Sequence, residues 1–120
     1  KDLVVGFCER ASFDWGSQRL EVKNFNPGLF QVPKTATHIG VTLGVLDFDF
    51  ESLESSLSVS PVHFLELGGG VTSFSLTPDQ VAVPEHVGFV VLGLRFYEII
   101  ETEVYAFKQP LGIRILDVLV

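Results

Sequence analysis

The sequence contains little cysteine and no methionine. Cys8 is the only cysteine among 120 residues, so an intramolecular disulfide and a zinc site built from several cysteines are both excluded. Because Cys8 follows an apolar stretch, we expect a small buried side chain there and not a nucleophile. The chain begins at Lys1 and has no methionine, which predicts that it is a piece of a longer protein.

Long apolar runs are also missing, although the composition is hydrophobic. Apolar residues make up 47% of the chain and charged residues 19%, so enough apolar surface is present to offset the entropy lost on ordering, and global disorder is excluded. No run approaches the ~20 apolar residues that a membrane span requires. The sequence predicts a single soluble domain over residues 1–120 and leaves its compartment open.

Positive charge is absent from the middle of the chain. No lysine or arginine lies between Lys34 and Arg95, and the formal net charge is -7. The acids of this interval are Asp47, Asp49, Glu51, Glu54, Glu66, Asp79 and Glu85. A chain without a basic patch offers no footprint for phosphates, so nucleic acid is not expected as a partner.

Helical periodicity is missing as well, because no long segment keeps apolar residues at i, i+3, i+4 and i+7. Apolar and polar residues alternate instead, which is typical of half-buried strands. The frequent Phe, Val and Leu also favour strands. The predicted strands cover residues 2–8, 12–16, 19–25, 37–51, 56–66, 71–76, 87–100, 103–108 and 112–119.

Two of these strands carry specific expectations. In residues 37–51 the apolar positions change from odd to even, which predicts a β-bulge or a crossing between sheets at Gly44 and Val45. Residues 87–100 are apolar on both faces in their first half, which predicts a central strand. Their second half is expected to form a hairpin with residues 104–107.

Short strands without intervening helices predict an all-β fold. The favoured architecture is an antiparallel two-sheet β-sandwich, immunoglobulin-like or related, because strands that are apolar on both faces suit two packed sheets. A small β-barrel is the alternative.

Several stretches resemble a known family. They are Gln-Val-Pro at 31–33, Thr-Ala-Thr-His at 35–38, Leu-Asp-Phe-Asp-Phe-Glu at 46–51, Val-Leu-Gly-Leu-Arg-Phe-Tyr at 91–97, Tyr105, and Gly-Ile-Arg-Ile at 112–115. Together they resemble the C-terminal half of an uncharacterised Bacteroidetes protein family, over about residues 20–120. The resemblance implies a separate N-terminal region and motifs that are structural, not catalytic. The family often has Asn-Gly where this chain has Glu101 and Thr102, which implies a looser hairpin turn here.

An acidic ladder is the clearest candidate for chemistry. Asp47, Asp49 and Glu51 alternate with Phe48 and Phe50, so the carboxylates are expected on one strand face about 7 Å apart. This spacing suits calcium or glycoside hydrolysis, but no calcium-binding loop or cleft motif accompanies it. We expect the carboxylates to face solvent and the two rings to point into the core, because a one-residue slip would bury charge. The three acids remain the only metal-ligand candidates.

Other residue types lack the spacing that catalysis needs. His38, His63 and His86 are far apart in the sequence, which indicates structural roles. The glycines at 68–70 lack the Lys-Ser/Thr ending of a phosphate loop, and the serines between 52 and 60 lack a Gly-x-Ser-x-Gly elbow. No catalytic residue and no cofactor is predicted, and the chain is not expected to be an enzyme.

The leading hypothesis is therefore a non-enzymatic structural or protein-interaction domain. The alternative is a carbohydrate or small-ligand binding module, with Trp15, Tyr97 and Tyr105 as candidate binding rings. Packing of these rings in the core or on a sheet face is the competing interpretation. A third, weaker hypothesis is an enzyme with Asp47 and Asp49 in a cleft. Sheet edges or an apolar sheet face also predict association with a protein partner or a second copy.

Overall fold

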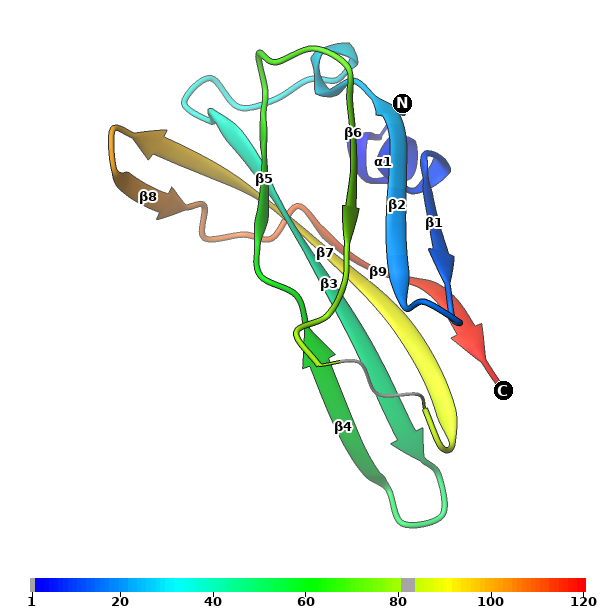
Figure 1. Cartoon of the computed structure of the whole chain (residues 1–120). Coiled ribbons are helices and arrows are strands. Elements are labelled where there is room, and N and C mark those ends of the chain that lie inside the picture. The colour runs from blue at the N-terminus through cyan, green and yellow to red at the C-terminus, as the bar shows by residue number, and fades with distance from the viewer. Residues whose placement is uncertain (1, 81–83) are drawn as a thin grey trace.

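Two antiparallel sheets make up most of the molecule (Figure 1). The computed structural model describes residues 2–80 and 84–120. The elements in chain order are α1 (Leu3–Glu9), β1 (Ala11–Asp14), β2 (Arg19–Phe25), the 3-10 helix η1 (Pro27–Leu29), β3 (His38–Asp49), β4 (Glu54–Val59), β5 (His63–Glu66), β6 (Thr72–Leu76), β7 (Val87–Ile100), β8 (Glu103–Ala106) and β9 (Gly112–Leu119). The predicted all-β, two-sheet class is confirmed.

The larger sheet is organised around two long strands. β3 and β7 pair without a register shift from His38 opposite Tyr97 to Phe48 opposite Val87. β4 and β5 both pair with β3, while β8 and β9 both pair with β7. The predicted central position of residues 87–100 is thus confirmed. The hairpin with β8 is confirmed too, and its two-residue turn has Glu101 at a positive φ of 56°.

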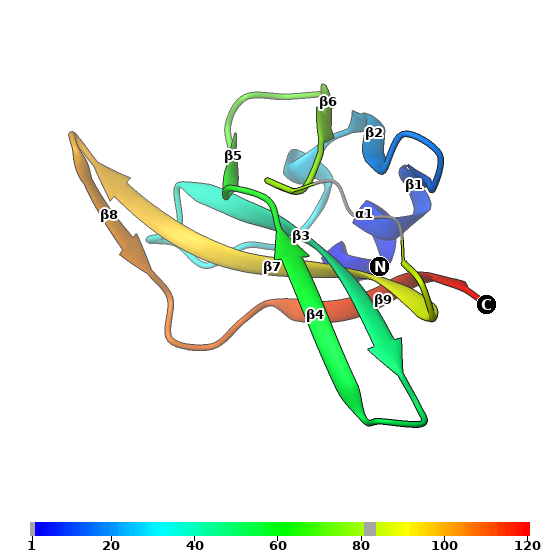
Figure 2. The ribbon, with the colours of Figure 1, turned by 60° about the horizontal axis from the view of Figure 1, so that its bottom comes forward.

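The smaller sheet has the order β1-β2-β6 and lies over one face of the larger sheet (Figure 2). The core fills the space between them. Strand alternation decides which side chains enter it. The fully or almost fully buried apolar residues are Phe7 of α1, Leu20, Val22 and Phe25 of β2, Ile39, Val41 and Leu43 of β3, and Val90, Leu92 and Leu94 of β7.

The first predicted strand is wrong, because residues 3–9 form the helix α1. The Asp2 side chain accepts a hydrogen bond from the Val4 N–H at 2.7 Å and so caps the helix. Leu3, Val4 and Phe7 all face the core, and the Phe7 ring lies 5.1 Å from that of Phe25. The helix has only seven residues, which is too short for a helical period to stand out from alternation.

The predicted bulge or crossing between sheets at Gly44 and Val45 is also wrong, since β3 keeps its register with β7 through both residues and stays in the larger sheet. The face that carries Ile39 and Leu43 therefore continues to Asp47 and Asp49. Leu46 and Phe48 lie on the opposite face. The apolar residues change from one face of β3 to the other where the core ends. The backbone continues without a bulge at this point.

The single strand predicted over residues 56–66 is divided into β4 and β5. Ser60 makes the division, because its N–H donates to the Leu43 carbonyl at 2.8 Å and its Oγ accepts from the Leu43 N–H at 2.9 Å. The same hydroxyl donates to the Pro61 carbonyl. Proline has no N–H to continue the ladder, so pairing with β3 resumes only at His63.

Candidate functional site

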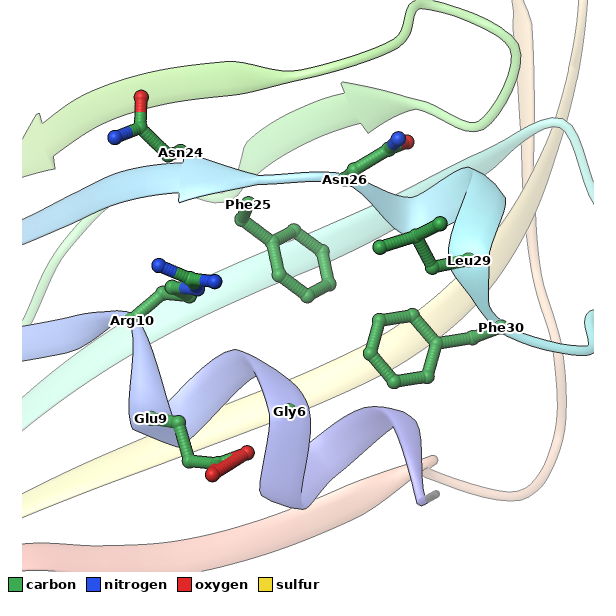
Figure 3. A pocket seen from close by; sticks show the side chains of 8 residues that line it. All are labelled: Gly6, Glu9, Arg10, Asn24, Phe25, Asn26, Leu29 and Phe30. Carbon is green, nitrogen blue, oxygen red and sulfur yellow. The ribbon is translucent and has the colours of Figure 1, made fainter.

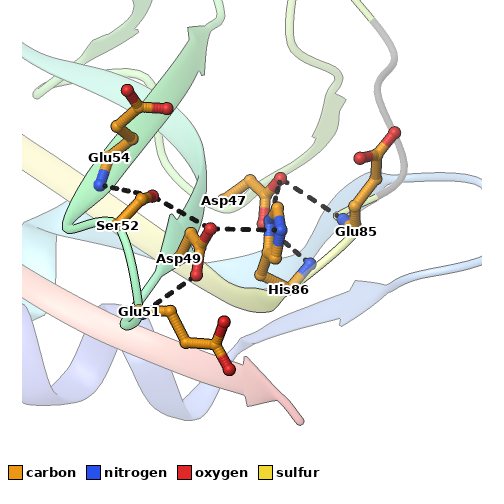
Figure 4. A network of polar contacts seen from close by, with 7 residues as sticks. All are labelled: Asp47, Asp49, Glu51, Ser52, Glu54, Glu85 and His86. Atoms are coloured by element: carbon orange, nitrogen blue, oxygen red, sulfur yellow. Dashed lines mark hydrogen bonds and ion pairs between the residues drawn. The ribbon is translucent and has the colours of Figure 1, made fainter.

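The acidic ladder forms a polar network with a residue distant in sequence (Figure 4). His86 lies between Asp47 and Asp49, with its Nδ1 3.4 Å from Asp47 Oδ2 and its Nε2 3.5 Å from Asp49 Oδ2. The backbone N–H groups of Glu85 and His86 also donate to Asp47, at 3.3 and 3.1 Å. The network joins the end of β3 to the segment that enters β7.

Asp49 has a second task in the turn between β3 and β4. Its carboxylate accepts hydrogen bonds from the Glu51 N–H at 3.0 Å and from the Ser52 hydroxyl at 2.9 Å. The Leu53 N–H donates to the Asp49 carbonyl at 2.8 Å, and Leu53 takes a positive φ of 62°. Side chains of Asp commonly hold turns in this way. Asp49 therefore holds the turn in place and also contacts His86.

The network keeps both aspartates ionised. Burial raises the pKa of Asp47, but the hydrogen bonds from Glu85 and His86 and the nearby imidazole outweigh it, so the pKa of Asp47 lies below its ordinary value. For Asp49 the hydrogen bonds from the Glu51 N–H and the Ser52 hydroxyl lower the pKa, against a smaller effect of burial. Hydrogen bonds to the charged form favour it.

The expectation that this ladder faces open solvent is wrong for two of its three acids. The side chains of Asp47 and Asp49 are only 23% and 25% exposed and are paired with His86. Glu51 lies in the turn, and its carboxylate points away from the network (Figure 4). The expected burial of the rings is wrong as well, because Phe50 is 61% exposed and Phe48 is only half-buried. The two rings contact each other, with centroids 4.5 Å apart.

The chemistry open to this network is limited. It borders a shallow hollow of about 180 Å³, lined by Asp47, Asp49, Glu54, Ser55, Ser56 and His86. Both imidazole nitrogens already face carboxylates, so no ring nitrogen is directed at a substrate. Within residues 2–80 and 84–120, no group of three or more His, Cys, Asp or Glu side chains is arranged to hold a metal ion. The arrangement suits a clamp between two strands.

The other residues singled out in the sequence lie apart from this network. The His38 Nδ1 is 2.7 Å from the Thr37 hydroxyl, and the His63 ring stacks on Phe74 at 4.2 Å. Burial lowers the pKa of His63. Cys8 is half-buried against the core, and burial raises the pKa of its thiol. A raised pKa keeps this thiol protonated and a poor nucleophile.

The three candidate binding rings are not brought together. Trp15 is half-buried over Gly88, and its Nε1 donates to Asp117 at 3.1 Å. Tyr97 packs beside Phe64, with ring centroids 4.9 Å apart. Tyr105 is half-exposed and its hydroxyl donates to Glu103.

Register explains the separation of the two tyrosines. Tyr105 lies opposite Glu98 in the β7–β8 ladder, so it is on the other face of the sheet from Tyr97. The hydrogen bond to Glu103 raises the pKa of Tyr105. The three rings thus occupy three separate places and provide no shared stacking platform.

The face of the larger sheet that points away from the core is apolar. The sequence interpretation expected an apolar sheet face but did not identify its residues. We name it the outer sheet face and define it by Leu46 and Phe48 of β3, Leu57 and Val59 of β4, Phe89 and Val91 of β7, and Ile113, Ile115 and Val118 of β9. The β3–β7 register places all of them on one side. Arg95 of β7 lies at one end of this face. By alternation, these four strands place no other charged residue on it.

Comparison with protein-family models, curated proteins and solved structures finds no match to this chain. In the part of the chain that the structure describes, no helix is both long and apolar enough to cross a membrane.

Proposed function

We propose that this chain is a non-enzymatic interaction domain that associates with a second copy of itself through the outer sheet face. One observation carries the proposal. Leu57, Ile113 and Ile115 are 59%, 68% and 62% exposed on a face whose one charged side chain from its four strands is Arg95. Leaving such side chains in water is unfavourable, and covering them is the main source of association energy.

The size of the face supports a binding role. Its side chains expose on the order of 500 Å² of apolar surface, which is the size of the largest patches on soluble monomers, and such patches often mark binding sites. Phe64 and Val62, both partly exposed, extend it toward the other end of β3. A standard interface covers about 800 Å² per partner, so the extended apolar face would supply most of one partner's share of such an interface.

The shape of the face supports a second copy as the occupant. A hollow of about 190 Å³ lies over Gly93, next to the exposed Ile113. A Cβ atom added at Gly93 would meet nothing within 4 Å. Around a two-fold axis each face meets itself, so Ile113 of one copy is able to fill the hollow of the other.

The charge distribution also favours association of two copies through the outer sheet face. Each copy carries a net charge of -7, so most approaches between two copies bring like charges together. The outer sheet face avoids this repulsion because its strands present no acid there. Two sheets stacked face to face at about 10 Å are a common packing in β-sandwich proteins.

Analytical ultracentrifugation tests the proposal directly. The wild-type chain should sediment as a dimer, and Ile115→Asp should sediment as a monomer, because a carboxylate would be buried in the interface. Gly93→Leu should also be monomeric, since it fills the hollow without adding charge. Val71→Asp is the matched control: Val71 is 62% exposed but lies in the loop before β6, so this variant should remain dimeric.

Either of two results overturns the proposal. One is a wild-type chain that stays monomeric up to about 1 mM, which would place any self-affinity below about 4 kcal/mol. The other is a dimer that survives both Ile115→Asp and Gly93→Leu. The immunoglobulin-like arrangement, the Bacteroidetes family resemblance and the carbohydrate-binding alternative stay predictions.

A further inference from the structure

A cavity of about 420 Å³ opens between α1 and the segment that follows β2 (Figure 3). It lies on the core side of the larger sheet, away from the outer sheet face. Its lining residues are Gly6, Glu9, Arg10, Asn24, Phe25, Asn26, Leu29 and Phe30. A volume of this size is within the range of small-molecule sites.

One end of the cavity is apolar and firmly built. Phe25 and Phe30 stack with their ring centroids 5.8 Å apart and an angle of 21° between their planes. Gly6 makes room for Phe30, because a Cβ atom at Gly6 would lie 2.3 Å from the ring. Leu29 extends from η1 toward the rings and is 77% exposed (Figure 3). A ligand covering Leu29 would remove this apolar surface from water.

The backbone around the rings is held by local hydrogen bonds. The Asn26 side chain accepts from the Gly28 N–H at 2.9 Å and caps η1. Asn24 takes a positive φ of 56°, and its N–H donates to the Ser73 hydroxyl at 3.0 Å. This is where β2 shifts its register against β6. Non-glycine residues at positive φ often accompany binding sites, and Asn24 directly precedes Phe25 of the cavity wall.

The other end of the cavity carries a cation. The Arg10 backbone is fixed, because its N–H donates to Phe7 and its carbonyl accepts from the Lys23 N–H at 3.0 Å. Among the residues that the structure describes, the Arg10 guanidinium has no hydrogen-bond or ion-pair partner. Figure 3 shows this side chain over the gap between α1 and β2. Glu9 lines the same end.

We propose that this cavity binds a small aromatic monocarboxylic acid. The ring of the ligand packs against Phe30 and Leu29, with the buried Phe25 behind Phe30, and its carboxylate pairs with the guanidinium of Arg10, which is suited to two parallel hydrogen bonds.

Titration with 3-phenylpropionate, followed by the backbone amide signals of the labelled protein in NMR, tests this site. Saturable shifts should be confined to Gly6, Arg10, Phe25 and Phe30. The neutral 3-phenylpropionamide should bind roughly tenfold more weakly, because it lacks the charge that pairs with Arg10. Equal binding of acid and amide would overturn the proposal, as would shifts scattered over the outer sheet face.

Two variants separate the two ends of the site. Arg10→Gln should weaken binding of the acid roughly tenfold and leave binding of the amide unchanged. Leu29→Ala should weaken binding of both ligands. Arg19→Gln is the matched control, because Arg19 is exposed on β2 outside the cavity. An equal effect of Arg10→Gln and Arg19→Gln on the acid would show non-specific attraction and overturn the assignment. The titration is repeated on Ile115→Asp, so the result does not depend on dimer formation.

Discussion

At the scale of single residues, His86 shows what alternation alone does not reveal. The sequence identified Asp47 and Asp49 as one ladder, but their partner follows them by more than 35 residues and has no motif spacing. The signal lies in the pairing of the strands. Because β3 and β7 are antiparallel from end to end, the residue that precedes β7 must meet the end of β3. Sequence periodicity predicts both strands but not which strands pair.

The clamp makes a pH prediction whose sign follows from the lowered pKa values. A carboxylate whose folded pKa lies below its unfolded value stabilises the fold above that unfolded value, and the contribution is lost as pH falls through the folded pKa. For Asp47 and Asp49 the ordinary value is 3.8. The free energy of unfolding should therefore be steady near neutral pH and fall as the pH drops below about 4.

Chemical denaturation at several pH values checks this expectation. The double variant Asp47→Asn with Asp49→Asn should be less stable at pH 7 and should lose less stability on acidification than the wild type. Asp79→Asn is the control, since Asp79 is exposed and outside the clamp. If the double variant keeps the full wild-type slope below pH 4, the clamp does not link pH to stability.

At the scale of elements, the long strands were predictable and the short helix was not. β2 and β7 have the predicted bounds, because buried and less buried residues alternate along most of each strand. Residues 3–9 read equally well as a strand, and only the cap by Asp2 and the packing of Phe7 on Phe25 decide for a helix. Tertiary contacts of this kind have no local signature in a sequence.

Gly6 provides a test of how α1 is fitted to its neighbour. Alanine in a helix is favoured over glycine by about 1 kcal/mol, but the new methyl group would overlap the Phe30 ring, and overpacking costs about 1–3 kcal/mol. We expect Gly6→Ala to lower the free energy of unfolding by about 1 kcal/mol. In a Phe30→Ala background the same change should raise it, because the ring is gone.

A double-mutant cycle in chemical denaturation measures this coupling. The four proteins are the wild type, the two single variants and the double variant. The interaction between the two sites should be at least about 1 kcal/mol and favourable in the double variant. Additive effects would show that Phe30 moves aside without cost, and α1 would then be less tightly fitted than the contact indicates.

At the scale of the whole molecule, the larger sheet has two apolar faces. β3 and β7 bury one face in the core along residues 39–45 and 90–96, and their other face is apolar but uncovered. The apolar residues change from odd to even positions along β3, and a bulge at Gly44 and Val45 would place all of them on one face of the sheet. A chain that is apolar on both sides of a straight strand instead predicts two buried faces, one inside the monomer and one against a partner.

The two faces predict different responses to truncation. Leu43 is fully buried in the core, so Leu43→Ala should cost about 2–5 kcal/mol at any protein concentration. Phe48 lies on the outer sheet face, so Phe48→Ala should cost less in a dilute sample and more in a concentrated one, because dimer formation stabilises the folded state by mass action. Chemical denaturation at two concentrations, at least a hundredfold apart, separates the cases. If Phe48→Ala lowers the free energy of unfolding by the same amount at both protein concentrations, the outer sheet face contributes nothing to association under these conditions.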